Sequence, residues 1–226
     1  MSLLGRAFLG IWHNIEIDWR DEYDAWHTRE HMPERAGIPG FLRGRRYINY
    51  ALKSHVCFTL YEASHAETFR SPAYLARLNA PTEWTQQVQP HMPDFVRGAF
   101  RPSVSLGEGI GGAMATLRIV AGGPDQRALL PRLTECAYVV SAMQGVCGVH
   151  VGQALNDVAS APTKESKVRG DTDQRTDDFV MMVEGISSGD LTARMDAIRQ
   201  LLRDAAELKV TADVYPLAYS LTADGQ

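Results

Sequence analysis

The sequence contains few cysteines, and they complete no known cysteine motif. Cys57, Cys136 and Cys147 are the only three among 226 residues, and no two of them form a CxxC pair. Disulfide frameworks use an even number of cysteines, and zinc sites commonly use CxxC pairs. We therefore expect three reduced, buried thiols in a cytoplasmic protein.

Long apolar runs and an excess of positive charge are also missing. No apolar run approaches the about 20 residues of a membrane-spanning helix. Residues 1–6 lack the apolar segment and cleavage site of a secretory signal. The formal net charge is -4, and the one basic run, at residues 43–46, is short. We therefore expect no membrane and no nucleic-acid partner.

Two motifs of common enzyme classes are absent as well. No GxSxG pattern is present, so the sequence does not indicate a serine nucleophile of the hydrolase type. The glycine-rich residues 107–112 lack the Lys-Ser/Thr ending of a phosphate-binding loop, so we interpret them as a linker.

The sequence does contain a regular alternation of strand and helix patterns. Hydrophobic residues make up 45% and charged residues 22%, as in ordinary soluble globular proteins. Hydrophobic periodicity and turn residues predict strand, helix, strand, strand, helix and strand over residues 7–13, 18–32, 41–50, 55–62, 64–78 and 95–106. This order is the ferredoxin-like βαββαβ plan.

A second βαββαβ series follows in residues 113–221, interrupted by a polar stretch at 157–177 that we interpret as a flexible hairpin loop. Weak sequence similarity, such as residues 58–62 with 180–184, supports an internal duplication. We expect an α+β chain of two ferredoxin-like units, residues 1–107 and 108–226. A four-stranded sheet with helices on one face must bury its other face. The two sheets are therefore expected to pack face to face as an intramolecular α/β barrel, a pseudo-dimer that could also form a homodimer.

The predicted helix 18–32 carries the most unusual chemistry. Pro33 cannot lie deep inside a helix, so the regular part is expected to end near Met32. At 100° per residue, Glu30 lies on the apolar stripe, and His27 and His31 flank it one turn apart. A buried carboxylate needs a partner. It either pairs with Arg43, Arg45 or Arg46 of the next strand as a structural clasp or belongs to a pocket.

The segment around this helix resembles a known superfamily. The residues that carry the resemblance are Trp26-His27-x-x-Glu30-His31-x-Pro33-Glu34-Arg35, Ile38-Pro39-Gly40-Phe41, Arg45-Arg46-Tyr47, Ser71-Pro72-x-Tyr74-Leu75 and Trp84. They are similar to the dimeric α/β-barrel superfamily and within it to EthD-like and related uncharacterised proteins. The likeness covers residues 7–106, and the second half matches in plan only. The superfamily includes polyketide cyclases, lactone isomerases, small monooxygenases and haem proteins, so the fold alone selects no function.

Acid–base chemistry on a small molecule is the enzymatic hypothesis that fits these residues. Histidine titrates near neutrality, so we expect His31 to act as acid or base, with Glu30 or Glu34 orienting it and His27 nearby. Arg45 or Arg46 would hold an enolate or a carboxylate. Trp26 and Tyr47 would line a pocket for a small apolar or aromatic ligand. The reaction would be proton abstraction beside a carbonyl, as in a cyclase or an isomerase.

Two alternatives remain open at this point. His27 and His31 at i and i+4 could share a metal if His13, Glu30, Glu34 or His91 supplied a third ligand, but the HExxH-type pattern is absent. We assign neither a metal nor a cofactor. The protein could also bind a hydrophobic ligand without catalysis or be purely structural. A cavity beside His31 and Glu30 would favour an enzyme, whereas a sealed hydrogen-bonded cluster would favour a structural role.

Overall fold

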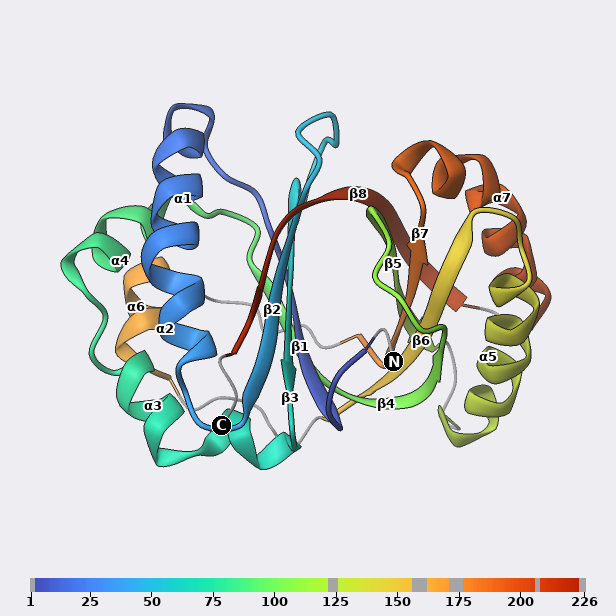
Figure 1. Cartoon of the computed structure of the whole chain (residues 1–226), viewed down its shortest axis with the longest axis horizontal. Coiled ribbons are helices and arrows are strands. Elements are labelled where there is room, and N and C mark those ends of the chain that lie inside the picture. The colour runs from blue at the N-terminus through green and yellow to red at the C-terminus, as the bar shows by residue number, and fades with distance from the viewer. Residues whose placement is uncertain (1–2, 122–125, 156–161, 171–176, 206–207, 224–226) are drawn as a thin grey trace. The chain divides into compact units, whose positions relative to one another are not determined.

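The computed structural model describes residues 3–121, 126–155, 162–170, 177–205 and 208–223 (Figure 1). Its strands form a closed barrel in the hydrogen-bonded order β1-β3-β2-β8-β5-β7-β6-β4. The predicted α+β class with ferredoxin-like halves and a barrel is thereby confirmed. The strands are β1 (Ala7–His13), β2 (Phe41–Ile48), β3 (Cys57–Ala63), β4 (Val96–Leu106), β5 (Ala113–Ala121), β6 (Val146–Ala154), β7 (Phe179–Gly185) and β8 (Leu208–Thr222).

One compact unit, the N-terminal unit, consists of Leu4–Ala99, Leu155–Thr176 and Ala218–Gln226. Antiparallel ladders join β3 to β1 and to β2. Its helices gather on one face of these strands (Figure 1). They are α1 (Arg20–Trp26), α2 (Met32–Ala36), α3 (Pro72–Leu78), α4 (Glu83–Val88) and α6 (Lys164–Arg169), with 3₁₀ turns at Ile17–Trp19, Ala66–Arg70 and Gln89–His91. Every residue of β3 is buried, as expected for a strand covered on both faces.

The other compact unit, the C-terminal unit, consists of Met1–Leu3, Phe100–Ala154 and Asp177–Leu217. Its strand β7 pairs with β5 and β6, and β5 also pairs with β8. Helices α5 (Gln126–Ser141) and α7 (Ser188–Ala205) pack on these strands through a core that contains Leu133, Val140, Leu191 and Ile198. These compact units combine segments from both halves of the sequence. The predicted division into residues 1–107 and 108–226 concerns the sequence halves, and it stays a prediction.

The two units share local features that support an internal duplication. Gly40 and Gly145 both have a positive φ, and each is followed by a register shift at the start of the next strand. Each unit also places a fully buried carboxylate, Glu62 or Glu184, on its central strand. The duplication itself stays a proposal.

The polar stretch at 157–177 differs from the expected loop. Its residues 164–169 form helix α6, which begins with a capping box between Thr163 and Ser166. Residues 156–161 and 171–176 lie outside the described part of the chain. A six-residue helix carries too little periodicity to stand out in a polar sequence, so the loop interpretation missed it.

The cysteines are free thiols, as expected. Cys57 and Cys136 are buried, but Cys147 is only half-buried. Burial raises the pKa of the Cys57 thiol to about 12, so this group stays protonated. In the described residues, no helix is both long and apolar enough to cross a membrane.

Replacing Gly40 with alanine should lower the free energy of unfolding by about 1–3 kcal/mol. Gly40 has φ of +94°, and a Cβ there would lie 2.6 Å from the Thr68 hydroxyl oxygen. Gly109 is the matched control, because a Cβ there has no atom within 4 Å. Urea unfolding should show a change of about 0.5 kcal/mol or less for Gly109→Ala. Equal losses of stability for Gly40→Ala and Gly109→Ala would show that the backbone at Gly40 does not require glycine.

Candidate functional site

The predicted helix contains one π turn at its most unusual residues. This turn, His27–His31, lies between α1 and α2, and it is closed by the Met32 N–H, which donates to the His27 carbonyl five residues earlier. Pro33 has no N–H, and in a regular α-helix its ring would clash with the carbonyl four residues before it. The wider turn relieves this clash. The helix therefore continues to Ala36, and the predicted end near Met32 is wrong. Such π turns are frequent at functional sites.

The π turn borders a partly open cavity, and the described residues that line it belong to the N-terminal unit. The cavity has a volume of about 60 Å³, which is room for a few waters or one compact ligand. Including the mouth, the empty space is about 830 Å³. Aromatic and aliphatic side chains line it together with a few polar groups, a composition typical of small-molecule sites.

His27 and His31 both line this cavity. Their side chains are almost fully buried, their ring centroids lie 5.4 Å apart, and the His31 ring lies 4.3 Å from that of Trp26. The Nδ1 atom of each histidine is buried and has no hydrogen-bond partner among the described residues. A sealed structural cluster would satisfy such atoms, since buried polar groups in proteins are nearly always paired. The histidine pair therefore differs from a fully hydrogen-bonded structural cluster.

Both histidines are neutral at pH 7. Burial lowers the pKa of His27 well below its usual value, and the neighbouring His31 and Arg46 lower it further. Burial also lowers the pKa of His31 well below its usual value, and the positive charge of Arg35 adds to the effect. A neutral imidazole has one nitrogen that can accept a proton and one that can donate a hydrogen bond. Each ring can therefore exchange a proton with a ligand.

His13, considered in the sequence only as a metal ligand, also lines the cavity. Its Nδ1 donates to the Asn14 carbonyl at 2.7 Å, and its Nε2 accepts from the Tyr23 hydroxyl at 3.1 Å. This assignment of the ring proton follows from the carbonyl, which can only accept. Burial lowers the pKa of His13 to about 4. Both ring nitrogens of His13 therefore have partners, and the ring fixes the position of the Tyr23 hydroxyl.

Helix α6 brings a charged cluster to the cavity. The buried Arg35 guanidinium of α2 forms an ion pair with Glu165, and Gln89 Nε2 donates to the same carboxylate at 2.7 Å. Arg169 Nη1 lies 3.8 Å from Glu165, and its guanidinium carbon lies 3.7 Å from the centre of the Phe95 ring. All five residues line the cavity.

Glu30 does not line the cavity. Its carboxylate accepts hydrogen bonds from the Thr82 hydroxyl at 2.5 Å and the Thr85 hydroxyl at 3.4 Å. Thr85 Oγ1 also accepts from Trp26 Nε1 at 3.2 Å. Glu30 therefore ties the predicted helix to α4 and supports the indole that borders the cavity. The described hydrogen bonds of Glu30 include neither the expected pairing with an arginine of β2 nor the expected contact with His31.

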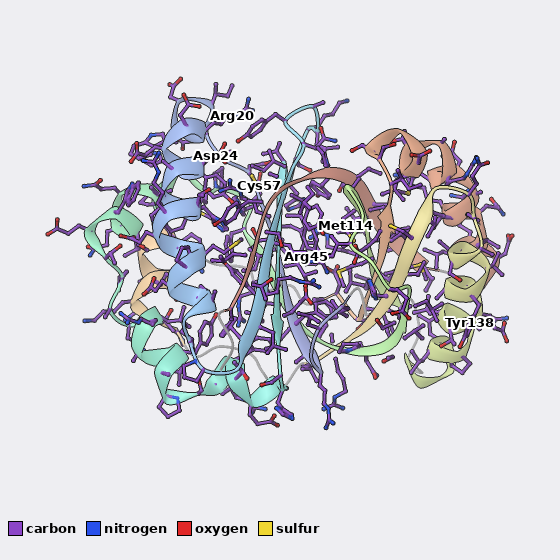
Figure 2. All side chains as sticks on the ribbon, in the orientation of Figure 1. Arg20, Asp24, Arg45, Cys57, Met114 and Tyr138 are labelled. Atoms are coloured by element: carbon purple, nitrogen blue, oxygen red, sulfur yellow. The ribbon has the colours of Figure 1, made fainter. Side chains whose placement is uncertain are left out.

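The predicted arginines of β2 also lie away from the cavity. Arg45 is fully buried; its Nε donates to Glu62 at 2.9 Å and its Nη1 to the Tyr47 hydroxyl at 3.1 Å. Residues 44 and 46 of β2 face the helices. A Cβ at Gly44 would meet Met32 of α2, and Arg46 donates to Thr28 of the π turn. Because side chains alternate along a strand, Arg45 points to the opposite face of β2. Figure 2 shows Arg45 on the side of β2 away from α1, which carries Asp24.

Arg46 faces the helices, but it holds the predicted helix instead of bordering the cavity. Its Nη2 donates to Thr28 Oγ1 at 3.0 Å and lies 3.5 Å from Asp24 Oδ1. Tyr47 stacks on Phe58 at 5.6 Å between ring centroids. In the described part of the chain, no three His, Cys, Asp or Glu side chains converge to hold a metal ion.

The residues that the sequence analysis missed fall into two groups. Arg35 lies four residues after His31, so extending the helical stripe past Pro33 would have found it. Tyr61, Gln89, Glu165 and Arg169 come from other elements and carry no local signal of their position.

No family model and no curated protein matches the sequence. Solved structures do match the fold. An anthrone oxidase-like protein is 11% identical over 97% of this chain and 93% of its own, with a TM-score of 0.64. A candidate monooxygenase from Fusobacterium nucleatum subsp. nucleatum is 10% identical over 98% and 94%, with a TM-score of 0.57. A chlorite dismutase from Candidatus Nitrospira defluvii is 12% identical over 94% and 91%, with a TM-score of 0.54.

At these identities the similarity establishes the fold alone. It extends over nearly the full length of the chain and of each neighbour, so it includes both halves. The EthD-like relationship stays a resemblance in the sequence. The chain has the dimeric α/β-barrel fold, with both ferredoxin-like halves in one polypeptide.

Proposed function

We propose that this protein binds a compact aromatic ketone in the cavity of the N-terminal unit and moves the proton beside its carbonyl, with His31 as the base. The observation that carries this proposal is the neutral pair His27 and His31, which borders a cavity and retains buried ring nitrogens without a hydrogen-bond partner. A general base must be unprotonated and within reach of its substrate. His31 has a lowered pKa and lines the cavity, so it fits both conditions.

The proton transfer can be followed atom by atom. A C–H bond next to the carbonyl breaks, its proton moves to a nitrogen of His31, and the electron pair moves into the carbonyl oxygen to give an enolate. The resulting imidazolium and enolate form an ion pair, which is strengthened by the low dielectric constant of a buried site. No external oxidant or reductant is needed for this step.

Tyr61 is the candidate donor to the enolate oxygen. It lines the cavity, and its hydroxyl is buried without a hydrogen-bond partner among the described residues. Burial raises the pKa of Tyr61, so the phenol keeps its proton at neutral pH. A protonated phenol in a buried site can stabilise developing negative charge on an oxygen.

Two considerations guide the choice of ligand. The aromatic lining and the cavity size favour one or two fused rings over a larger molecule. One structural neighbour is described as anthrone oxidase-like, and an anthrone is a polycyclic aromatic ketone with acidic C–H bonds. Haem, which some members of the superfamily bind, does not fit this cavity, because it needs far more room than the few water positions there.

Exchange of the acidic protons of 2-tetralone, a two-ring ketone, tests the proposal. In D₂O the ¹H NMR signal beside the carbonyl should decay faster with protein than without it. His31→Gln should slow the protein-dependent rate by about 100-fold or more, the usual contribution of a general base. His65→Gln, at an exposed position, is the matched control and should keep the rate. A His31→Gln variant that is folded and exchanges at the wild-type rate would overturn the assignment.

Ligand binding without catalysis is the second candidate function. Burial makes both imidazoles weak bases, whereas an efficient general base has a pKa near the working pH. Saturable binding of 2-tetralone, seen as a change in tryptophan fluorescence, with no acceleration of exchange would favour this function.

A further inference from the structure

We infer that the cavity takes a ligand bearing a carboxylate or a comparable oxyanion, and that Glu165 of α6 occupies the place of this group in the ligand-free protein. The inference deepens the proposed function, because it names the polar group of the ligand for the same cavity. It rests on the proposal that a small molecule binds there, but not on the proton transfer.

The charges of the lining are the first observation. Among the described residues that line the cavity, Arg35, Arg97 and Arg169 are cations and Glu165 is the acid. Guanidinium groups in a cavity lining favour an anionic over a cationic ligand. Arg35 contacts the Glu165 carboxylate more closely than Arg169 does. Glu34, outside the lining, lies 3.3 Å from Arg35.

The surroundings of Glu165 are the second observation. Its side chain is almost fully buried and is held by the Arg35 guanidinium and the Gln89 amide, with Arg169 3.8 Å away. Arg35 and Gln89 are themselves 3% and 1% exposed. Donors of this kind, converging on one carboxylate from several elements, form a built carboxylate site. In the ligand-free protein, a side chain of the chain itself fills that site.

The position of α6 makes an exchange of carboxylates feasible. Arg35 belongs to α2 and Gln89 to the turn after α4, whereas Glu165 lies on a six-residue helix. A helix of this length is not stable by itself, so side-chain contacts hold it in place. Apart from Glu165, the contacts of its side chains and backbone include Arg169 over Phe95 and the Lys164 N–H to Asn79 Oδ1 at 3.2 Å. A ligand carboxylate that takes over Arg35 and Gln89 would therefore move Glu165 without disrupting a larger element.

Binding of 2-naphthoate and its neutral analogue 2-naphthamide to the full chain tests this inference. In isothermal titration at about pH 7.5, wild-type protein should bind 2-naphthoate more tightly than the amide. Glu165→Gln should raise the affinity for 2-naphthoate about tenfold or more, because the internal competitor is gone, and change that for the amide by less than about threefold. Glu34→Gln is the matched control. It removes the same charge beside Arg35 without freeing the cavity, so it should change 2-naphthoate affinity by less than about threefold.

A double variant keeps the test decisive if Glu165→Gln fails to fold. Arg35→Gln with Glu165→Gln leaves no unpaired charge between the two positions, and it should abolish the preference for 2-naphthoate over the amide. The inference is overturned if this preference persists, if Glu34→Gln acts as strongly as Glu165→Gln, or if 2-naphthoate does not bind. Loss of 2-tetralone exchange in all proteins would refute the proposed chemistry and leave this binding result intact.

Discussion

Replacing Glu62 with glutamine should lower the free energy of unfolding by about 3–5 kcal/mol, since it removes the negative charge that two buried arginines contact. Glu62 is 0% exposed on β3. Its carboxylate accepts from Arg43 Nε and Nη2 at 2.9 and 2.8 Å, from Arg45 Nε at 2.9 Å, and from the Leu4 N–H at 2.6 Å. An amide of the same shape can accept at one atom only and carries no charge.

Urea unfolding followed by circular dichroism measures this loss. Asp196→Asn is the control. Asp196 is fully exposed, and its ion pair with Arg199 at 3.9 Å is a weak surface contact, so the unfolding midpoint of this variant should match that of the wild type. A Glu62→Gln protein that unfolds at the wild-type midpoint would show that the arginines do not depend on this carboxylate.

Acidification from pH 7 to pH 4.5 should destabilise the protein strongly, because three buried histidines resist protonation. The pKa of His13 is about 4 in the folded protein, against about 6.5 in an unfolded chain. Between these values the unfolded chain binds a proton that the folded protein does not. Stability is therefore full above about pH 6.5 and falls as the pH drops toward 4, by about 3 kcal/mol for His13 alone. His27 and His31, whose pKa values are also lowered, add to the loss in the same direction.

Unfolding midpoints at a series of pH values between 7.5 and 4.5 would check this expectation. The loss should be smaller in His13→Asn, which removes one of the three groups. It should be unchanged in His65→Asn, because the exposed His65 changes its surroundings little on unfolding. A midpoint independent of pH over this range would contradict the burial of neutral histidines.

Much of the fold could be predicted from the order of the sequence patterns. The eight strands were expected near their observed positions because their apolar residues are dense and bounded by glycine, proline or polar turns. The bounds of the first helix failed for a local reason. The π turn at His27–His31 lets the helix pass Pro33, and a constant 3.6-residue period cannot represent such a turn.

The candidate site could be predicted only in part. Trp26, His27 and His31 border the cavity because helical periodicity places them beside the buried stripe. The assignment of Arg45 relied on nearness in sequence, but strand alternation turns this residue toward Glu62. The pair of Arg35 and Glu165 joins residues 130 positions apart, and no local pattern encodes such a contact.

The protonation of His31 in the free and ligand-bound protein is the most direct test of the proposed site. ¹⁵N NMR of histidine-labelled protein, with His31→Gln to assign the signals, distinguishes neutral imidazole from imidazolium. We expect His31 to be neutral at pH 7.5, because burial lowers its pKa well below the usual value. Its ring signals should shift when 2-tetralone binds, because the His31 side chain lines the cavity. A His31 that is protonated at pH 7, or that does not respond to a saturating ligand, would contradict its role as the base.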